Sequence, residues 1–138
     1  MNSRVQAILN FWFEETPPEK RFKKDESFDL LIRNKFLSDY EKASNDELND
    51  WKLNAKSSLA LVILFDQFSR NIFRNDKKAF SQDFKTREIV YNAIDSGFLD
   101  EMSQSEKFFM ILPLIHSEEI KDHEIAYSLL DKHLRDHP

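Results

Sequence analysis

One glycine in 138 residues, Gly97, is the feature of this sequence that most restricts its fold. Only four prolines accompany it, so residues that end helices or form turns are sparse, and the segments between them have helical lengths. Phosphate-binding loops, dinucleotide fingerprints and the nucleophile elbow of hydrolases each need more than one glycine within a few residues. The sequence therefore excludes these motifs and predicts helices rather than strands.

Composition and length limit the class of protein further. Apolar residues make up 41% of the chain and charged residues 33%, which suits one globular domain spanning residues 1–138. Because cysteine is absent, disulfides, thiol nucleophiles and cysteine-ligated metal centres are excluded. We also expect no cofactor. The net charge of −5 does not favour nucleic acid or an anionic membrane as a partner. The basic run at residues 20–24 is bounded by prolines and acidic residues, and we interpret it as a solvated loop.

No segment of the sequence is typical of export or membrane insertion. Residues 1–13 are interrupted by Asn10 and lack a small-residue cleavage site, so they do not resemble a secretory signal. The longest apolar run, Leu59 to Phe65, is far shorter than the roughly 20 residues of a membrane helix. We therefore expect a cytoplasmic protein without a membrane segment.

Apolar residues recur at three- and four-residue spacing in several segments, which is the period of an amphipathic helix. The segment 54–73 contains the longest apolar run and no turn residue, so we expect a central helix surrounded by the others. Further helices are expected over residues 5–13, 28–43, 84–94, 103–112 and 118–135, with a short one near 48–51. The pattern thus predicts an all-α fold, an irregular antiparallel array of about six helices.

Polar residues at the ends of these segments indicate where helices begin and end. Asp25 or Ser27 can cap the second helix, Asp46 the short helix after it, and Ser117 the last one. Gly97 stands where a left-handed C-terminal cap belongs.

The helix that begins near residue 103 carries both a start and a stop signal. Ser103 and Glu106 have the spacing of a capping box. Pro113 lacks the backbone N–H that a helix interior needs, so we expect it to break or kink this helix.

Five polar residues interrupt the end of the apolar central helix: Asp66, Gln67, Arg70, Asn71 and Arg74. Asp66, Arg70 and Arg74 recur at four-residue intervals, so a continuous helix would place them in one stripe. A carboxylate this deep in an apolar segment needs a partner, because an unpaired buried charge costs several kcal/mol. The stripe is therefore either a structural salt bridge between Asp66 and Arg70 or a site where the arginines receive a carboxylate or phosphate.

A second polar cluster precedes and opens the last helix: His116, Glu118, Glu119 and His123. Glu119 and His123 have the spacing of a metal-ligand pair, but all four histidines lie in the last quarter of the chain, so we predict no metal site. His116 could act as a general acid or base, with Glu118 or Asp66 as its orienting carboxylate.

The two polar clusters should meet in space, because each places polar groups at an interruption in an apolar helix. We expect Glu118 or His116 to lie within salt-bridge or hydrogen-bond distance of Arg70 or Arg74.

Several blocks of sequence carry a family resemblance. They are Phe-Trp-Phe at residues 11–13, Trp51, the run from 59 to 74 with its Asp-Gln-Phe-Ser-Arg-Asn, and Leu-Pro-Leu-Ile-His-Ser-Glu at 112–118. In this order they resemble the bacterial family catalogued as domain of unknown function 924. The resemblance implies an all-helical fold similar to tetratricopeptide-repeat proteins and no established activity. Ser69 stands where the family usually has proline, and family members usually continue for another helix or so beyond the point where this chain ends.

Two functions are compatible with these patterns. The first is a binding or protein-interaction module for a protein or a small anionic ligand, with a site formed by Asp66, Gln67, Arg70, Asn71, Arg74, His116 and Glu118. The alternative is a small-molecule enzyme that uses His116 as acid or base and Arg70 and Arg74 as an anion clamp. An open apolar groove would favour the first function, and a concave site with His116 hydrogen-bonded to a carboxylate would favour the second.

The last helix, residues 118–135, carries an apolar band wider than one neighbouring helix needs to cover. An uncovered apolar face is typical of an interface, so we expect this helix to mediate self-association, most simply as a two-fold dimer. The band consists of Ile125, Ala126, Leu129, Leu130 and Leu134.

Overall fold

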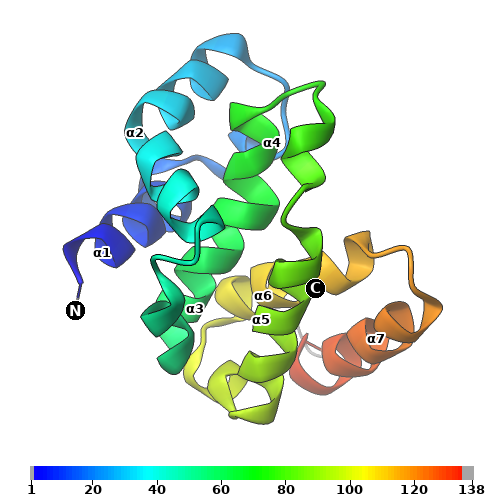
Figure 1. The fold of residues 1–138 in the computed structure, drawn as a ribbon. Coiled ribbons are helices and arrows are strands. Elements are labelled where there is room, and N and C mark those ends of the chain that lie inside the picture. The colour runs from blue at the N-terminus through cyan, green and yellow to red at the C-terminus, as the bar shows by residue number, and fades with distance from the viewer. Residues whose placement is uncertain (1, 135–138) are drawn as a thin grey trace.

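Six helices form the structure, a computed structural model that describes residues 2–134, when the continuous segments α3, η4 and α4 are counted as one helix (Figure 1). Within these residues there is no strand, which confirms the all-α prediction. The α-helical segments are α1 (Ser3–Leu9), α2 (Glu26–Ser44), α3 (Ala55–Val62), α4 (Ser69–Ile72), α5 (Asp83–Asp95), α6 (Gln104–His116) and α7 (Ile120–Leu134). Two π-helical segments, η1 (Asn10–Glu15) and η4 (Ile63–Phe68), continue α1 and join α3 to α4, and short 3-10 turns lie at η2 (Pro18–Lys20), η3 (Asn49–Leu53), η5 (Lys77–Phe80) and η6 (Phe98–Glu101).

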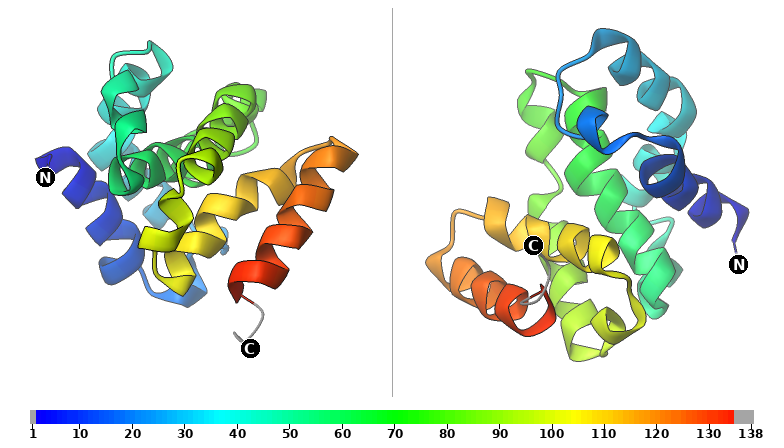
Figure 2. Two further views of the ribbon diagram at one scale, coloured as in Figure 1. Left: turned by 90° about the horizontal axis from the view of Figure 1, so that it is seen from below. Right: turned by 180° about the vertical axis from the view of Figure 1, so that it is seen from behind.

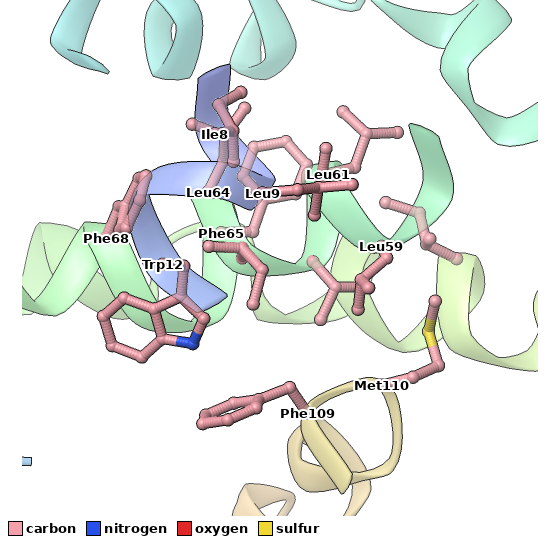
Figure 3. Packing of buried hydrophobic residues seen from close by; sticks show 14 of the residues in the cluster. Ile8, Leu9, Trp12, Leu59, Leu61, Leu64, Phe65, Phe68, Phe109 and Met110 are labelled. Atoms are coloured by element: carbon pink, nitrogen blue, oxygen red, sulfur yellow. The ribbon is translucent and has the colours of Figure 1, made fainter. Parts of the chain in front are cut away.

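The helix formed by α3, η4 and α4 lies at the centre of the molecule, as the apolar run predicts. It contacts α1, α2, α5 and α6, and the views in Figures 1 and 2 show it between the N-terminal and C-terminal helices. Leu59, Leu64 and Phe68 on this helix are fully buried. Figure 3 shows side chains of the central helix packed together with Trp12 of η1 and Phe109 of α6. Because apolar side chains on every face of the segment are buried, packing rather than intrinsic propensity explains its position.

Several capping predictions are confirmed. The Asp25 side chain accepts a hydrogen bond from the Phe28 N–H, whereas Ser27 lies inside the helix. Ser103 and Glu106 form the full capping box at the start of α6. Gly97 follows α5 in the left-handed conformation, with φ of 75°, where a Cβ would be unfavourable.

Two expectations about helix ends are not met. Of the break or kink expected at Pro113, the break does not occur, since α6 continues through Pro113 to His116. Asp46 does not cap the short helix near Trp51, because its φ of 61° places it in the left-handed region. Its carboxylate instead forms a salt bridge with Lys85.

The apolar band of α7 is partly covered within the chain. Ala126 is buried, and Ile125, Leu129 and Leu130 are half-buried against the core. The exposed apolar side chains of this helix are Ile120 and Tyr127, which lie outside the predicted band. Self-association through residues 118–135 stays a prediction, and residue 135 lies outside the described residues. Light scattering over a range of concentrations tests it, and a strictly monomeric protein would show that the remaining apolar face is too small to hold a dimer.

Among the described residues, no helix is both long enough and apolar enough to cross a membrane.

Candidate functional site

A cavity of about 180 Å³ lies where the central helix ends. It is lined by Arg21, Phe22, Gln67, Arg70, Asn71, Arg74 and His116. Its walls come from three separate parts of the chain: the loop after η2, the η4–α4 segment with the turn that follows it, and the last residue of α6. The Arg70 Nη2 lies 2.9 Å from the His116 Nδ1, so the prediction that the two polar clusters meet is confirmed.

Asp66 lies beneath this cavity, in the π-helical turn η4. Its side chain is only 4% exposed. One carboxylate oxygen, Oδ2, accepts a hydrogen bond from the Gln67 side-chain amide at 2.8 Å. The other, Oδ1, lies 3.1 Å from the His116 Nδ1 and 3.8 Å from the Arg70 Nη2. A π-turn inside an α-helix is a common feature of functional sites, and here it holds a buried carboxylate against an imidazole.

Arg70 links the buried carboxylate to the cavity. Its Nε donates to the Asp66 backbone carbonyl at 2.9 Å, which fixes the side chain back along its own helix. Its guanidinium also lies over the Phe80 ring, 5.5 Å from the ring centroid. These contacts hold the guanidinium at the cavity wall while its side chain remains 38% exposed.

Arg74 does not continue the polar stripe that the sequence predicts. The helix ends at Ile72, and Phe73 leaves the helical region of φ and ψ, so Arg74 points to α2 instead. There its Nε and Nη2 donate to Asp29, with Nη2 at 2.8 Å, and the Asn71 side-chain amide donates to the same carboxylate at 2.9 Å. Burial acts to raise the pKa of Asp29, but these hydrogen bonds outweigh it and leave the pKa below its ordinary value. The charge of Arg74 is therefore already compensated.

Arg21 and Phe22 are site residues that sequence reasoning missed. The basic run at 20–24 was expected to be solvated, yet the Arg21 guanidinium lies over the rings of Trp12, Phe13 and Phe109, at 5.6–5.9 Å. The one available signal was an aromatic residue, Phe22, within this basic run.

The charge of Arg21 has no compensating carboxylate among the described residues. One nitrogen of Arg21 donates to the Phe13 carbonyl at 3.3 Å. Its Nε is buried and has no hydrogen-bond partner in the described part of the chain. Burial lowers the pKa of Arg21 from its ordinary value, which reflects the cost of holding this charge away from water.

Asp83, at the start of α5, lies near the same cluster. Burial is the main cause that raises its pKa, and the negative charge of Asp66 adds to this effect. Arg70 and His116 act in the opposite direction, which places Asp83 within electrostatic range of both.

The remaining predicted residue, Glu118, lies outside the cavity. It is exposed after the end of α6 and forms no hydrogen bond or salt bridge to the described residues, so its predicted contact to Arg70 or Arg74 is absent from this structure. Glu119 uses its backbone N–H to bind the Ser117 hydroxyl, and His123 contacts the Ser117 carbonyl. Across residues 2–134 no group of three histidine, aspartate or glutamate side chains is placed to hold a metal ion.

A second buried aspartate, Asp122, anchors α7. Its Oδ2 accepts from Arg87 at 2.7 Å and from the Ser117 hydroxyl at 2.6 Å, and its Oδ1 accepts from the Tyr91 hydroxyl. Burial acts to raise the pKa of Asp122, but these three donors outweigh it and lower the pKa from its ordinary value. Burial, together with the hydrogen bond to Asp122, raises the pKa of Tyr91 to about 12.

Comparisons with known proteins agree with this description. The family described as "Bacterial protein of unknown function (DUF924)" matches residues 8–138. The chain belongs to this family. The chain is also similar to the solved structure of ATU0120, a protein of unknown function from Agrobacterium tumefaciens. It shares 33% sequence identity with this chain, with a TM-score of 0.88 over 94% of this chain and 73% of that one. No curated protein matches the chain. The DUF924 assignment thus supports the fold and carries no activity with it.

Proposed function

We propose that this protein binds a small anionic ligand in the cavity between Arg21, Arg70 and His116. The observation that carries the proposal is the charge balance of the cavity wall. Three arginines line it, but Asp29 compensates only Arg74, and Asp66 lies 3.8 Å from Arg70. Arg21 has no carboxylate partner in the described part of the chain. A protein rarely holds a partly buried cation without a counter-charge, so an anion is the ligand that best completes this arrangement.

The chemistry of the wall defines the ligand further. Guanidinium groups bind carboxylate and phosphate groups through paired N–H donors. A small oxyanion group suits a cavity in which Arg21, Arg70 and His116 surround the ligand. The cavity of about 180 Å³ accommodates such a group, with Phe22 at its rim. Because the lining is mostly polar, a small anion fits this cavity better than an apolar segment of a protein partner.

Titration with inorganic phosphate and with acetate at low ionic strength, followed by amide NMR shifts, tests the proposal. Binding should shift the amides around Arg21, Arg70 and His116. The variant Arg21→Gln should weaken phosphate binding at least about tenfold, because it removes the uncompensated charge. A matched control is Arg4→Gln, which removes an arginine from an ion pair with Asp39 outside the cavity and should leave the affinity unchanged. Equal loss in both variants, or no localised shift, would contradict the proposal.

A second candidate function is an enzyme that uses His116 as acid or base. The observation in its favour is the contact between the His116 Nδ1 and the buried Asp66 Oδ1, in a concave site. A carboxylate in this position orients an imidazole and stabilises its charged form. The lining residues include no serine, threonine or tyrosine hydroxyl, so a reaction here would use a group of the substrate or a water molecule. In a turnover screen of phosphate esters and carboxylic esters, His116→Gln should abolish turnover and retain binding. Turnover that survives this substitution would exclude His116 as the acid or base.

A further inference from the structure

The Nδ1 atom of His116 lies near two groups, and it cannot form hydrogen bonds to both of them at once. It lies 2.9 Å from the Arg70 Nη2 and 3.1 Å from the Asp66 Oδ1. Arg70 can only donate a hydrogen bond and an ionised Asp66 can only accept one. An imidazole nitrogen carries either a lone pair or a proton in the ring plane, so it can accept from Arg70 or donate to Asp66. The two contacts therefore belong to two placements of the ring proton: Nδ1 without a proton accepts from Arg70, and Nδ1 with a proton, in the neutral Nδ1–H tautomer or in the imidazolium, donates to Asp66.

Each state leaves one group unsatisfied. When Nδ1 accepts from Arg70, the buried Asp66 Oδ1 faces a lone pair, and the Arg70 Nη2, 3.8 Å from it, forms an ion pair with Asp66 but is too distant to donate a hydrogen bond. When Nδ1 carries a proton and donates to Asp66, the Arg70 Nη2 loses its acceptor. An anion in the cavity can supply that missing acceptor, because Arg70 and His116 both line it.

The geometry points to a proton-linked anion site: binding of an oxyanion at Arg70 is coupled to uptake of one proton by His116. This inference rests on the proposed function. Without ligand, a proton on Nδ1 would face the guanidinium at 2.9 Å, and like-charge repulsion favours the arrangement in which Nδ1 accepts from Arg70. With an anion bound, Arg70 donates to the ligand and Nδ1 carries a proton that it donates to Asp66. Because two negative charges then flank the ring, the imidazolium is favoured over the neutral Nδ1–H tautomer, and the ring takes up one proton from solvent. The imidazolium then lies between the carboxylate and the anion, and the site gains one positive charge.

The charges around His116 favour this coupling. Asp66 on η4 and Asp83 on α5 stabilise a charged ring, whereas Arg70 on α4 opposes it. Across the cavity, Arg21 and Arg74 also oppose it, although Asp29 compensates Arg74. On the α7 side, His123 hydrogen-bonds the carbonyl of Ser117, the residue after His116. An anion bound among these arginines offsets their repulsion of a charged His116 ring, and the attraction by the two carboxylates remains.

Calorimetry with sulfate tests the inference, because sulfate does not titrate near neutral pH. At a pH of about 8, the binding enthalpy should differ between buffers of different ionisation enthalpy, and the difference should correspond to uptake of nearly one proton per sulfate. The affinity should fall toward tenfold per pH unit above the titration range of histidine. In His116→Gln the proton uptake should vanish, whereas a matched change outside the cavity, His133→Gln, should retain it. If His116→Gln does not fold, the ¹⁵N shifts of the wild-type histidines give the same answer, because one ring should become doubly protonated when sulfate binds.

The outcomes separate this inference from the proposed function. Sulfate binding with no proton uptake, or with the same pH dependence in His116→Gln, would overturn the coupling and leave anion binding intact. No sulfate binding at any pH from about 5 to 8 would overturn both.

Discussion

Asp66 and Asp122 are equally buried, with side chains 4% exposed, yet their surroundings differ in kind. Asp122 accepts hydrogen bonds from three side chains, Arg87, Tyr91 and Ser117. The Arg87 guanidinium can only donate, and the hydroxyl groups of Tyr91 and Ser117 donate readily. Asp66 has one unconditional side-chain donor, Gln67, and a second that depends on the protonation of His116. Burial alone therefore does not distinguish a structural carboxylate from one in a functional site. The difference lies in whether the donors are complete without a ligand.

The largest expected effect in this comparison is the loss of the Asp122 charge. Asp122→Asn leaves Arg87 without its carboxylate and turns an amide N–H toward groups that donate. We expect the free energy of unfolding to fall by about 3 kcal/mol, at the low end for a broken buried pair because the Arg87 side chain is 36% exposed. Urea denaturation measures this loss. A loss below about 1 kcal/mol would show that Asp122 is not a structural anchor of α7.

Acid should act on the same anchor. Because the pKa of Asp122 is lower in the folded state than its ordinary value of 3.8, its stabilising contribution is present above that value. The contribution is lost as the pH falls through the lower pKa of the folded state. The stability difference between wild type and Asp122→Asn should therefore shrink as acid is added below pH 3.8. Denaturation curves of both proteins over this range provide the measurement, and parallel pH profiles would be inconsistent with a paired carboxylate.

Tyr91 provides a smaller, alkaline test of the Asp122 anchor. Its pKa is raised from 10.0 to about 12 in the folded protein, so its contribution is complete below pH 10 and is lost as the pH rises toward 12. Tyr91→Phe should cost about 1 kcal/mol at neutral pH, because Asp122 retains two other donors. The variant should also lose part of the alkaline destabilisation seen in wild type. Spectrophotometric titration of the tyrosines and thermal melts measure both effects.

The smallest expected effect on stability is at Asp66. If Asp66 has its full set of hydrogen-bond donors only when a ligand is bound, Asp66→Asn should lower the free energy of unfolding of the free protein by less than about 1 kcal/mol, or raise it. The same change should remove the proton uptake that accompanies sulfate binding, because the imidazolium loses its partner. A loss of a few kcal/mol, equal to that of Asp122→Asn, would show that the two aspartates are both structural and would count against a site at Asp66.

Much of the architecture follows from local sequence patterns. The central helix, the capping box at Ser103 and Glu106, and the left-handed Gly97 are confirmed, because periodicity and capping depend on residues within a turn or two of one another. The contact between Arg70 and His116 was also predictable, since two polar interruptions in apolar helices stabilise each other better than either is stabilised alone.

Other features required the tertiary structure. The π-turn η4 and the end of α4 at Ile72 redirect Arg74 to Asp29 on α2, a partner that no spacing rule connects with it. A break or kink was expected at Pro113, but α6 continues through this buried residue without a break, which the local breaker signal alone could not show.

From its sequence alone, this protein is an all-helical chain with a buried apolar centre and two polar interruptions, because those properties depend on residue type and on spacing along the chain. Only the tertiary structure decides which charges are compensated. Arg74 and Arg21 have the same side chain, yet one lies against a carboxylate and the other against three aromatic rings. The physical reason is that electrostatic energy depends on distance and burial in three dimensions, and residues 21, 70 and 116 come close only after the helices have packed.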